Sequence, residues 1–338
     1  MNTTEIQLPR FAVAAINLAS PRLGSEIIFA TDDFFAEKSR LLKVEEPVFI
    51  PDKYDQHGKW MDGWESKRRR IPGNDHCIIR LGAKGVISGI NINTKYFTGN
   101  HPPQGSLEAT FSNNDPDKKT QWTEILPISN LNADTDNFFP IPSELPFNYL
   151  RFNIFPDGGV ARLRVYGKPV GEWKSSDPSG FQELSAVVNG GNIVGFNDAH
   201  YGDPWVILAP GRGINMGDGW ETRRRREPGN DWIVISLGAP GIVEHIELDT
   251  AHFKGNYPDR CSVQGALIKN ADTENMLNDK CSWEELMGQQ KLEMDQIHNF
   301  GGSMINKIGA VSHVRLNIYP DGGVSRFRVF GNRSKNDP

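Results

Sequence analysis

The sequence repeats itself, and this duplication constrains the fold more than any other feature. Residues 62–82 and 218–238 align without a gap at an offset of 156, and 14 of the 21 aligned positions are identical. Residues 151–167 and 315–331 match again at 12 of 17 positions. Self-similarity on this scale indicates two copies of one structural unit, each built around a core of its own.

Each copy contains a run of arginines set between acids. Residues 218–231 read Asp-Gly-Trp-Glu-Thr-Arg-Arg-Arg-Arg-Glu-Pro-Gly-Asn-Asp, and residues 62–75 read Asp-Gly-Trp-Glu-Ser-Lys-Arg-Arg-Arg-Ile-Pro-Gly-Asn-Asp. Guanidinium forks beside carboxylates suit a pocket for a small anionic or planar ligand whose N–H groups the carboxylates accept. The alternative is a solvated, self-paired charged surface. Such a surface would not need the same residue order in both copies, which favours the pocket.

The overall composition is that of a soluble globular protein. The 338 residues suit two domains of ordinary size, and 38% are apolar and 23% charged. A net charge of −5 argues against a general nucleic-acid surface despite the arginines. The three cysteines show no C-x-x-C spacing, and no apolar run approaches the length of a membrane span. We therefore expect a cytoplasmic protein that engages neither nucleic acid nor membrane.

Short apolar segments between frequent glycines and prolines predict an all-β fold. With 34 glycines and 22 prolines and few convincing helices, each copy of about 145 residues approaches the size of an eight-stranded jelly roll. A Pro-Asp-Gly-Gly segment flanked by alternating residues predicts a closing hairpin in each copy. The expected strands are residues 26–30, 76–81, 86–93, 192–196, 232–237 and 242–249, with the hairpins at 151–167 and 315–331.

The alignment also predicts the domain organisation. The first module is expected at residues 1–170, including an N-terminal lead-in, a linker rich in Gly, Pro and Ser at 171–182, and the second module at 183–338. The offset between the copies is 166 at Asp198 and 156 at Asp218, so the first copy carries about ten extra residues near positions 45–59.

Several motifs spread over nearly the whole chain belong together, at residues 17–20, 30–36, 62–70, 210–212, 215–226, 249–258 and 319–326. In these segments the chain resembles the allantoicase family. The resemblance implies two tandem jelly-roll modules akin to galactose-binding-like domains, assembly into homo-oligomers, and hydrolysis of allantoate to ureidoglycolate and urea in purine breakdown.

The two copies differ at one loop of this resemblance. The second copy reads Asp249-Thr-Ala-His252, the form associated with the family, whereas the first has Asn93 and Tyr96 at these positions. If the loop bears chemistry, the second module is the expected site, and the first binds, assembles or acts weakly. Candidates from both modules are therefore retained.

Allantoate carries one carboxylate and two ureido groups on a single carbon. Its cleavage calls for an arginine that binds the carboxylate, groups that transfer protons, and acceptors for the ureido N–H groups. Side chains of an extended segment alternate between faces, so at most two of four consecutive arginines can face one ligand. We expect Arg224 or Arg225 to bind the carboxylate and Glu221 or His252 to transfer protons. The catalytic candidates are Glu221, His252, Asp231 and Glu65, and the substrate-binding candidates are Arg224, Arg225, Asn230, Arg326, Asp198, Asp321, Arg69, Arg70, Asn74 and Asp75.

A structural role is the alternative for several of these residues. Asp321 stands where a type I turn favours aspartate, and Asp198 could cap a loop. Trp64 and Trp220 are expected to pack rather than to stack on a ligand. His252 could equally be a hydrogen-bonded structural histidine.

No cofactor is identified from the sequence. It lacks an H-E-x-x-H motif, a Cys-His cluster and an EF-hand, yet scattered carboxylates with His252 leave a divalent cation such as Mn²⁺ open. The alternative function is a non-enzymatic β-sandwich that binds carbohydrate or another small ligand, because the strand at 162–167 also resembles discoidin-like modules. The odd number of cysteines speaks against such a module, which usually contains disulfides.

Overall fold

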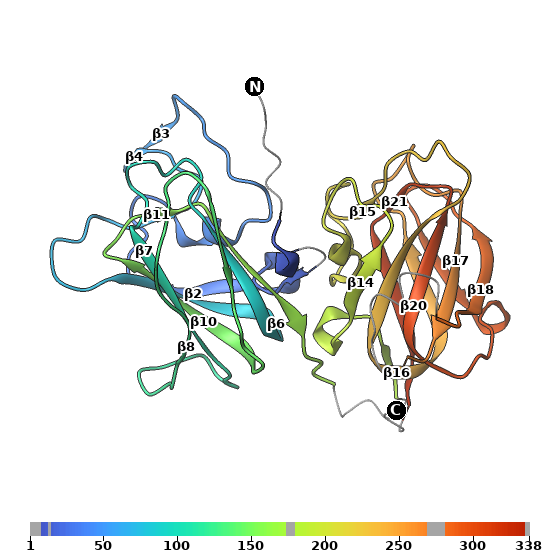
Figure 1. Ribbon diagram of the computed structural model, residues 1–338. Coiled ribbons are helices and arrows are strands. Elements are labelled where there is room, and N and C mark those ends of the chain that lie inside the picture. Colours follow the sequence, from blue (N-terminus) through green and yellow to red (C-terminus); the bar gives the residue numbers. More distant parts are fainter. Residues whose placement is uncertain (1–7, 13–14, 174–179, 269–280, 335–338) are drawn as a thin grey trace. The chain divides into compact units, whose positions relative to one another are not determined.

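The computed structural model describes residues 8–12, 15–173, 180–268 and 281–334, and the chain divides into two compact units, 1–168 and 169–338 (Figure 1). Regular structure in the described residues is almost entirely β-strand, with a few short 3₁₀ helices. No helix among them is long and apolar enough to span a bilayer. Residues 174–179 of the predicted linker lie outside the described residues, and the predicted module boundaries stay a prediction.

The first unit is a jelly-roll sandwich built on one long strand, β6 (Asp75–Asn93). The first half of β6 pairs with β2 and β10, and its second half pairs with β9. β12 lies on β6 with β1 outside it, and β7 and β8 extend the sheet beyond β10. The bounds are β1 (Ile16–Asn17), β2 (Glu26–Ala30), β7 (Gln104–Thr110), β8 (Thr123–Asn130), β9 (Asp136–Pro140), β10 (Pro146–Phe155) and β12 (Arg162–Pro169).

The second unit repeats this topology strand for strand. β16 (Asp231–Asp249) takes the place of β6, pairing with β14 and β20 along its first half and with β19 and β22 along its second. The duplication seen in the sequence is therefore a duplication of the whole sandwich. The bounds are β13 (Phe181–Glu183), β14 (Asn192–Phe196), β17 (Arg260–Ala266), β18 (Glu284–Lys291), β19 (Ile297–Gly301), β20 (Ala310–Tyr319) and β22 (Arg326–Arg333).

β6 and β16 correct the expectation of separate short strands, at residues 76–81 and 86–93 in the first copy and at 232–237 and 242–249 in the second. Each is a single strand of 19 residues. The register of β6 on β10 shifts between Arg80 and Gly85, where the strand bends from one part of the sandwich to the other. Gly82 lies at this bend, and a Cβ there would lie 2.4 Å from Cβ of Leu23. The glycine thus permits close packing at a bend rather than a chain reversal.

The predicted closing hairpins are wrong. β10 and β12 pair with β6 rather than with each other, and β20 and β22 likewise both pair with β16. The Pro-Asp-Gly-Gly segments instead lead across the sandwich, where β11 (Gly159–Val160) pairs with β5 (Trp64–Glu65) and β21 (Gly323–Val324) with β15 (Trp220–Glu221). Each segment therefore lies beside the start of an arginine run.

The ten extra residues of the first copy are confirmed. Nε of Arg162 donates to the carbonyl of Glu45, and Nε of Arg326 donates to the carbonyl of Gly211, so these two carbonyls are equivalent. Seventeen residues lead from Glu45 to Asp62, but only seven lead from Gly211 to Asp218. The additional chain contains the small hairpin of β3 (Tyr54–Asp55) and β4 (Gly58–Lys59).

Candidate active site

A buried tryptophan fixes the start of each arginine run. Trp220 has no exposed surface, and its indole Nε1 donates to the carbonyl of Asp198 at 2.8 Å. Trp64 is equally buried and donates to the carbonyl of Asp32 at 2.8 Å. The predicted packing role of both tryptophans is confirmed, and each ties the run to the loop that carries an aspartate.

Two of the four arginines in the second run are held by aspartates. Asp198 accepts the backbone N–H of Arg223 at 2.6 Å and its Nε and Nη2 at 3.0 and 2.8 Å. Asp321 accepts the backbone N–H of Arg225 at 2.8 Å, and Asp231 accepts its Nη1 at 3.0 Å. These acids therefore serve as anchors for the extended run.

The other two arginines, Arg224 and Arg226, are exposed, and neither pairs with any of the described residues. The alternation of an extended segment thus separates anchored arginines from uncommitted ones. Only the uncommitted ones can offer a whole guanidinium to a ligand.

The first run has the same arrangement. Nζ of Lys67 lies 3.5 Å from Oδ2 of Asp32, and Nη1 of Arg69 lies 2.8 Å from Oδ1 of Asp75. Asp157 accepts the backbone N–H of Arg69 at 2.7 Å. The intervening Arg68 and Arg70 are exposed and pair with none of the residues the structure describes.

An open cleft of about 740 Å³ lies beside the second run. Its wall includes the uncommitted Arg224, the predicted acid Glu221, and side chains from two other segments: His200, Tyr201, Tyr257 and Asp259. A smaller cavity of about 380 Å³ also borders the run and is lined by Asp198, Asp231 and Glu227. Arg224 meets carboxylates in both hollows, and of the two the larger cleft adds a histidine and the carboxylate of Glu221.

Glu221 is held in a fixed orientation at the cleft. Its backbone pairs with Tyr201, whose N–H donates to the carbonyl of Glu221 at 3.2 Å. Nδ2 of Asn256 donates to Oε1 of the Glu221 side chain. The first module repeats this pair, with Asn100 donating to Glu65 at 2.7 Å. Burial raises the pKa of Glu65 and outweighs the opposing effect of the Asn100 hydrogen bond.

The rest of the cleft wall differs between the modules. The backbone N–H groups of Phe35 and Ala36 donate to the carbonyl of Glu65 as those of His200 and Tyr201 donate to Glu221, so these pairs are equivalent. At the offset of 156, His101 and Pro103 replace Tyr257 and Asp259. The first module therefore has no counterpart of the His200 imidazole, the Tyr201 phenol or the Asp259 carboxylate, although a histidine stands in place of Tyr257.

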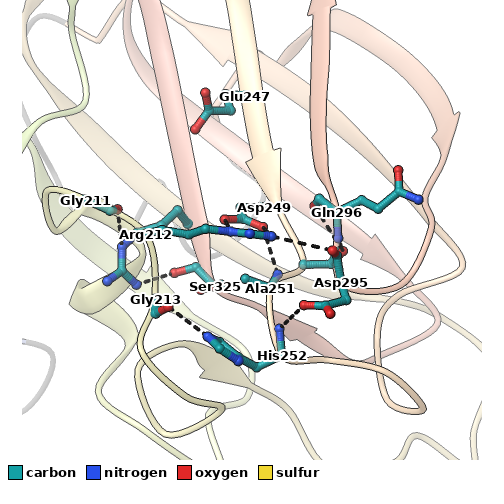
Figure 2. Close-up of polar contacts among 12 residues, drawn as sticks. Gly211, Arg212, Gly213, Glu247, Asp249, Ala251, His252, Asp295, Gln296 and Ser325 are labelled. Carbon is teal, nitrogen blue, oxygen red and sulfur yellow. Dashed lines mark hydrogen bonds and ion pairs between the residues drawn. The ribbon is translucent and has the colours of Figure 1, made fainter.

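His252 and Arg326 hold a strap at residues 211–213 through its backbone carbonyls, and both are absent from the described lining of the cleft. Figure 2 shows Nε2 of His252 donating to the carbonyl of Gly213 at 2.8 Å, while Asp295 accepts the His252 N–H at 2.8 Å. Arg326 is 2% exposed and its Nη2 donates to Asp218 at 2.9 Å. This geometry gives both residues a structural task, and their predicted roles toward substrate stay predictions.

Asp249 holds the same strap through Arg212. It is 1% exposed, it accepts from Nε of Arg212 at 3.0 Å and it also accepts the N–H of Ala251 (Figure 2). In the first module Asn93 stands at this position and donates to Asp136 at 2.7 Å. The difference between the copies at this loop therefore changes how the loop is held.

Similarity to known proteins shows to which family the chain belongs. The model of the allantoicase repeat matches residues 16–170 and again residues 182–334. The chain belongs to the allantoicase family. It is 49% identical over 328 residues to a probable allantoicase of Burkholderia mallei, covering 97% of both chains, and 50% identical over 321 residues to one of Photobacterium profundum, covering 95% of this chain and 97% of the relative.

A solved structure supports the same assignment. The crystal structure of allantoicase from Saccharomyces cerevisiae superposes with a TM-score of 0.78 at 34% identity, covering 95% of this chain and 94% of the other. The expected family and the expected pair of jelly-roll modules are thus confirmed.

The structure distributes the predicted site residues over several places. Glu221, Arg224, Arg225 and Asp321 line the larger cleft, and Asp198 and Asp231 line the smaller cavity with the arginines. Asn230 and Asn74 instead donate to Asn317 and Asn153 on neighbouring strands. Sequence reasoning missed His200, Tyr201, Asn256, Tyr257 and Asp259. For four of them the signal in the sequence was a difference between the copies close to motifs that match, whereas Asn256 is the same residue as its counterpart Asn100.

The donor set for a metal ion can be tested on the side chains themselves. Within the described part of the chain, no three His, Cys, Asp or Glu side chains come close enough together to hold one ion. These residues therefore supply no donor set through which a step of the reaction could be assigned to a cation.

Proposed function

We propose that this protein hydrolyses allantoate to ureidoglycolate and urea, and that the cleft of the second module is the active site. The observation that carries the proposal is that Arg224 and Glu221 line the same cleft. Arg224 has no partner among the described residues, and Glu221 is held in place by Asn256 and Tyr201. Membership of the allantoicase family supports the same reaction.

Arg224 is the residue that binds the substrate carboxylate. Arg223 and Arg225 line the same cleft but already donate to Asp198 and Asp231. A guanidinium binds a carboxylate through two parallel N–H donors, which fixes both position and orientation. The anchored neighbours keep the backbone of Arg224 in place, so less conformational freedom is lost on binding.

The reaction breaks the bond between the central carbon and one ureido nitrogen. Water adds its oxygen to that carbon, one proton leaves the water, and one proton reaches the departing nitrogen to complete urea. Glu221 is placed to accept the proton from water, and His200 on the same cleft wall is placed to donate the other. In the first module Phe35 stands in the place of His200, so we assign hydrolysis to the second module.

Urea release from allantoate by the purified protein tests the proposal, with and without a chelator. Arg224→Gln should lower kcat/KM about 100-fold, because a bidentate charge-assisted contact is lost. Arg226→Gln and Arg68→Gln are matched controls, since both remove exposed arginines that do not line the cleft, and each should stay within about threefold of wild type. A large loss in Arg68→Gln with none in Arg224→Gln would move the active site to the first module.

We also propose a cytoplasmic homo-oligomer. The three cysteines are free, and burial raises the pKa of the Cys261 thiol to about 12, which keeps it unreactive. Free thiols suit a reducing compartment. Light scattering on the purified protein and fractionation of cells test the two statements.

A further inference from the structure

The polar groups of the larger cleft differ in how far the protein itself has engaged them. Among its three arginines, Arg223 and Arg225 are anchored and Arg224 is not. Among its carboxylates, Asp321 accepts the backbone N–H of Arg225. The cleft thus presents one uncommitted guanidinium and two further carboxylates, those of Glu221 and Asp259.

Asp259 lies just before β17, and its side chain is 46% exposed at the cleft. Lys291 donates to Oδ1 and Arg260 donates to Oδ2 at 3.0 Å. These contacts, that with Lys291 above all, hold the pKa of Asp259 below its ordinary value. An ionised carboxylate has about four acceptor positions, so these two donors leave others for a ligand.

Allantoate matches this inventory group for group. It has one carboxylate for Arg224 and two ureido arms, each of which carries three N–H donors that need acceptors. We propose that Asp259 accepts the N–H groups of the second ureido arm and is the residue that selects allantoate over carboxylates with a single ureido group. This inference rests on the proposed function of the cleft.

The first module offers an internal comparison. It keeps the uncommitted arginine as Arg68 and the held glutamate as Glu65, but Pro103 stands where the second module has Asp259. Proline has neither a carboxylate nor an N–H, so the second acceptor is missing there. The carboxylate is therefore present in the second module and missing at the equivalent position of the first, as expected if it recognises the second ureido arm of allantoate.

The test compares two ligands on the full-length protein. Allantoate is the substrate, and ureidoacetate, with one carboxylate and one ureido group, is the competitive inhibitor. Asp259→Asn should lower kcat/KM for allantoate about tenfold or more, because an acceptor that binds N–H donors through a charge is lost. The inhibition constant of ureidoacetate should change less than twofold.

Lys291→Ala is the control for a purely structural role, because it removes one of the two donors that hold Asp259 and leaves its carboxylate. It should change both constants less than threefold. Equal effects of Asp259→Asn on the two ligands, no effect on either, or the same loss in Lys291→Ala would each overturn the inference. If the wild type released no urea, the proposed function would fail first. Calorimetry of the two ligands on wild type and Asp259→Asn would then decide the role of Asp259, and absence of allantoate binding would refute it.

Discussion

Replacing Arg326 with methionine tests whether this arginine is a structural residue or a ligand-binding one. Arg326 and Asp218 each have a side chain that is 2% exposed, and they pair at 2.9 Å. Arg326 also donates to the carbonyls of Gly211, Asp218 and Ser325 at 3.1, 2.8 and 2.7 Å. Methionine would keep much of the volume but leave the Asp218 carboxylate buried without its cation.

The expected loss of stability follows from that geometry. Removing one partner of a buried ion pair destabilises by about 3–5 kcal/mol, because the remaining charge is uncompensated. With a slope of about 2–3 kcal/mol per molar urea, the unfolding midpoint of the second module should fall by more than about 1 M. Arg162→Met should do the same in the first module, where Arg162 is 1% exposed and pairs with Asp62 at 2.6 Å.

Urea unfolding followed by tryptophan fluorescence measures this loss. Arg80→Met is the control, since Arg80 pairs with Glu26 and Asp115 at the exposed surface and should lose no more than about 1 kcal/mol. Adding Asp218→Asn to Arg326→Met should restore part of the stability, because the unpaired charge is removed. A folded Arg326→Met with an unchanged midpoint and a KM for allantoate raised tenfold would refute this reasoning and make Arg326 a substrate ligand.

Three further predictions concern the anchors around the site. Burial alone would raise the pKa of Asp198, but the hydrogen bonds and charge of Arg223 outweigh it and hold that pKa low. The stability this pair contributes is therefore present above about pH 3.9, the pKa of an unfolded aspartate, and is lost as pH falls through the lower folded value, so Arg223→Gln should flatten acid unfolding below that pH. His252→Asn keeps a residue that tolerates the φ of 71° and should retain urea release within about threefold, whereas a 100-fold loss would place the imidazole in the chemistry. Gly322→Ala should lower the thermal midpoint measurably, because φ is 137° and a Cβ would lie 2.7 Å from N of Pro258; an unchanged midpoint would contradict this.

Part of the candidate site could be predicted from the local pattern of the arginine run. The alternation of an extended chain predicted that at most two of the four arginines could face one ligand. In the structure alternate arginines, Arg223 and Arg225, are held by aspartates, whereas Arg224 and Arg226 are not. All four line the smaller cavity, so the limit on facing one ligand stays a prediction. Which pair would be anchored was not predictable. The reason is that the anchors are distant in sequence: Asp198 is 25 residues from Arg223, and Asp321 is 96 residues from Arg225.

The groups that transfer protons could not be predicted from a motif. His252 was a candidate because its loop matches a family motif, yet its Nε2 donates to the backbone carbonyl of Gly213 in the strap. His200 has no such motif, but it lies on the cleft wall with Glu221 because its backbone N–H donates to the carbonyl of Glu221 at 2.9 Å.

The sequence by itself determined the duplication, the all-β class, several strand positions such as Glu26–Ala30 and the place of the arginine runs. Repeats, alternation and turn residues are local properties, and they can be seen along the chain without knowledge of contacts. Only the tertiary structure decided that the Pro-Asp-Gly-Gly segments lead across the sandwich and pair beside Trp64 and Trp220. Strand partners and the bond made by each side chain depend on groups far apart in sequence, which come together only when the two halves of β6 or β16 collect their neighbours.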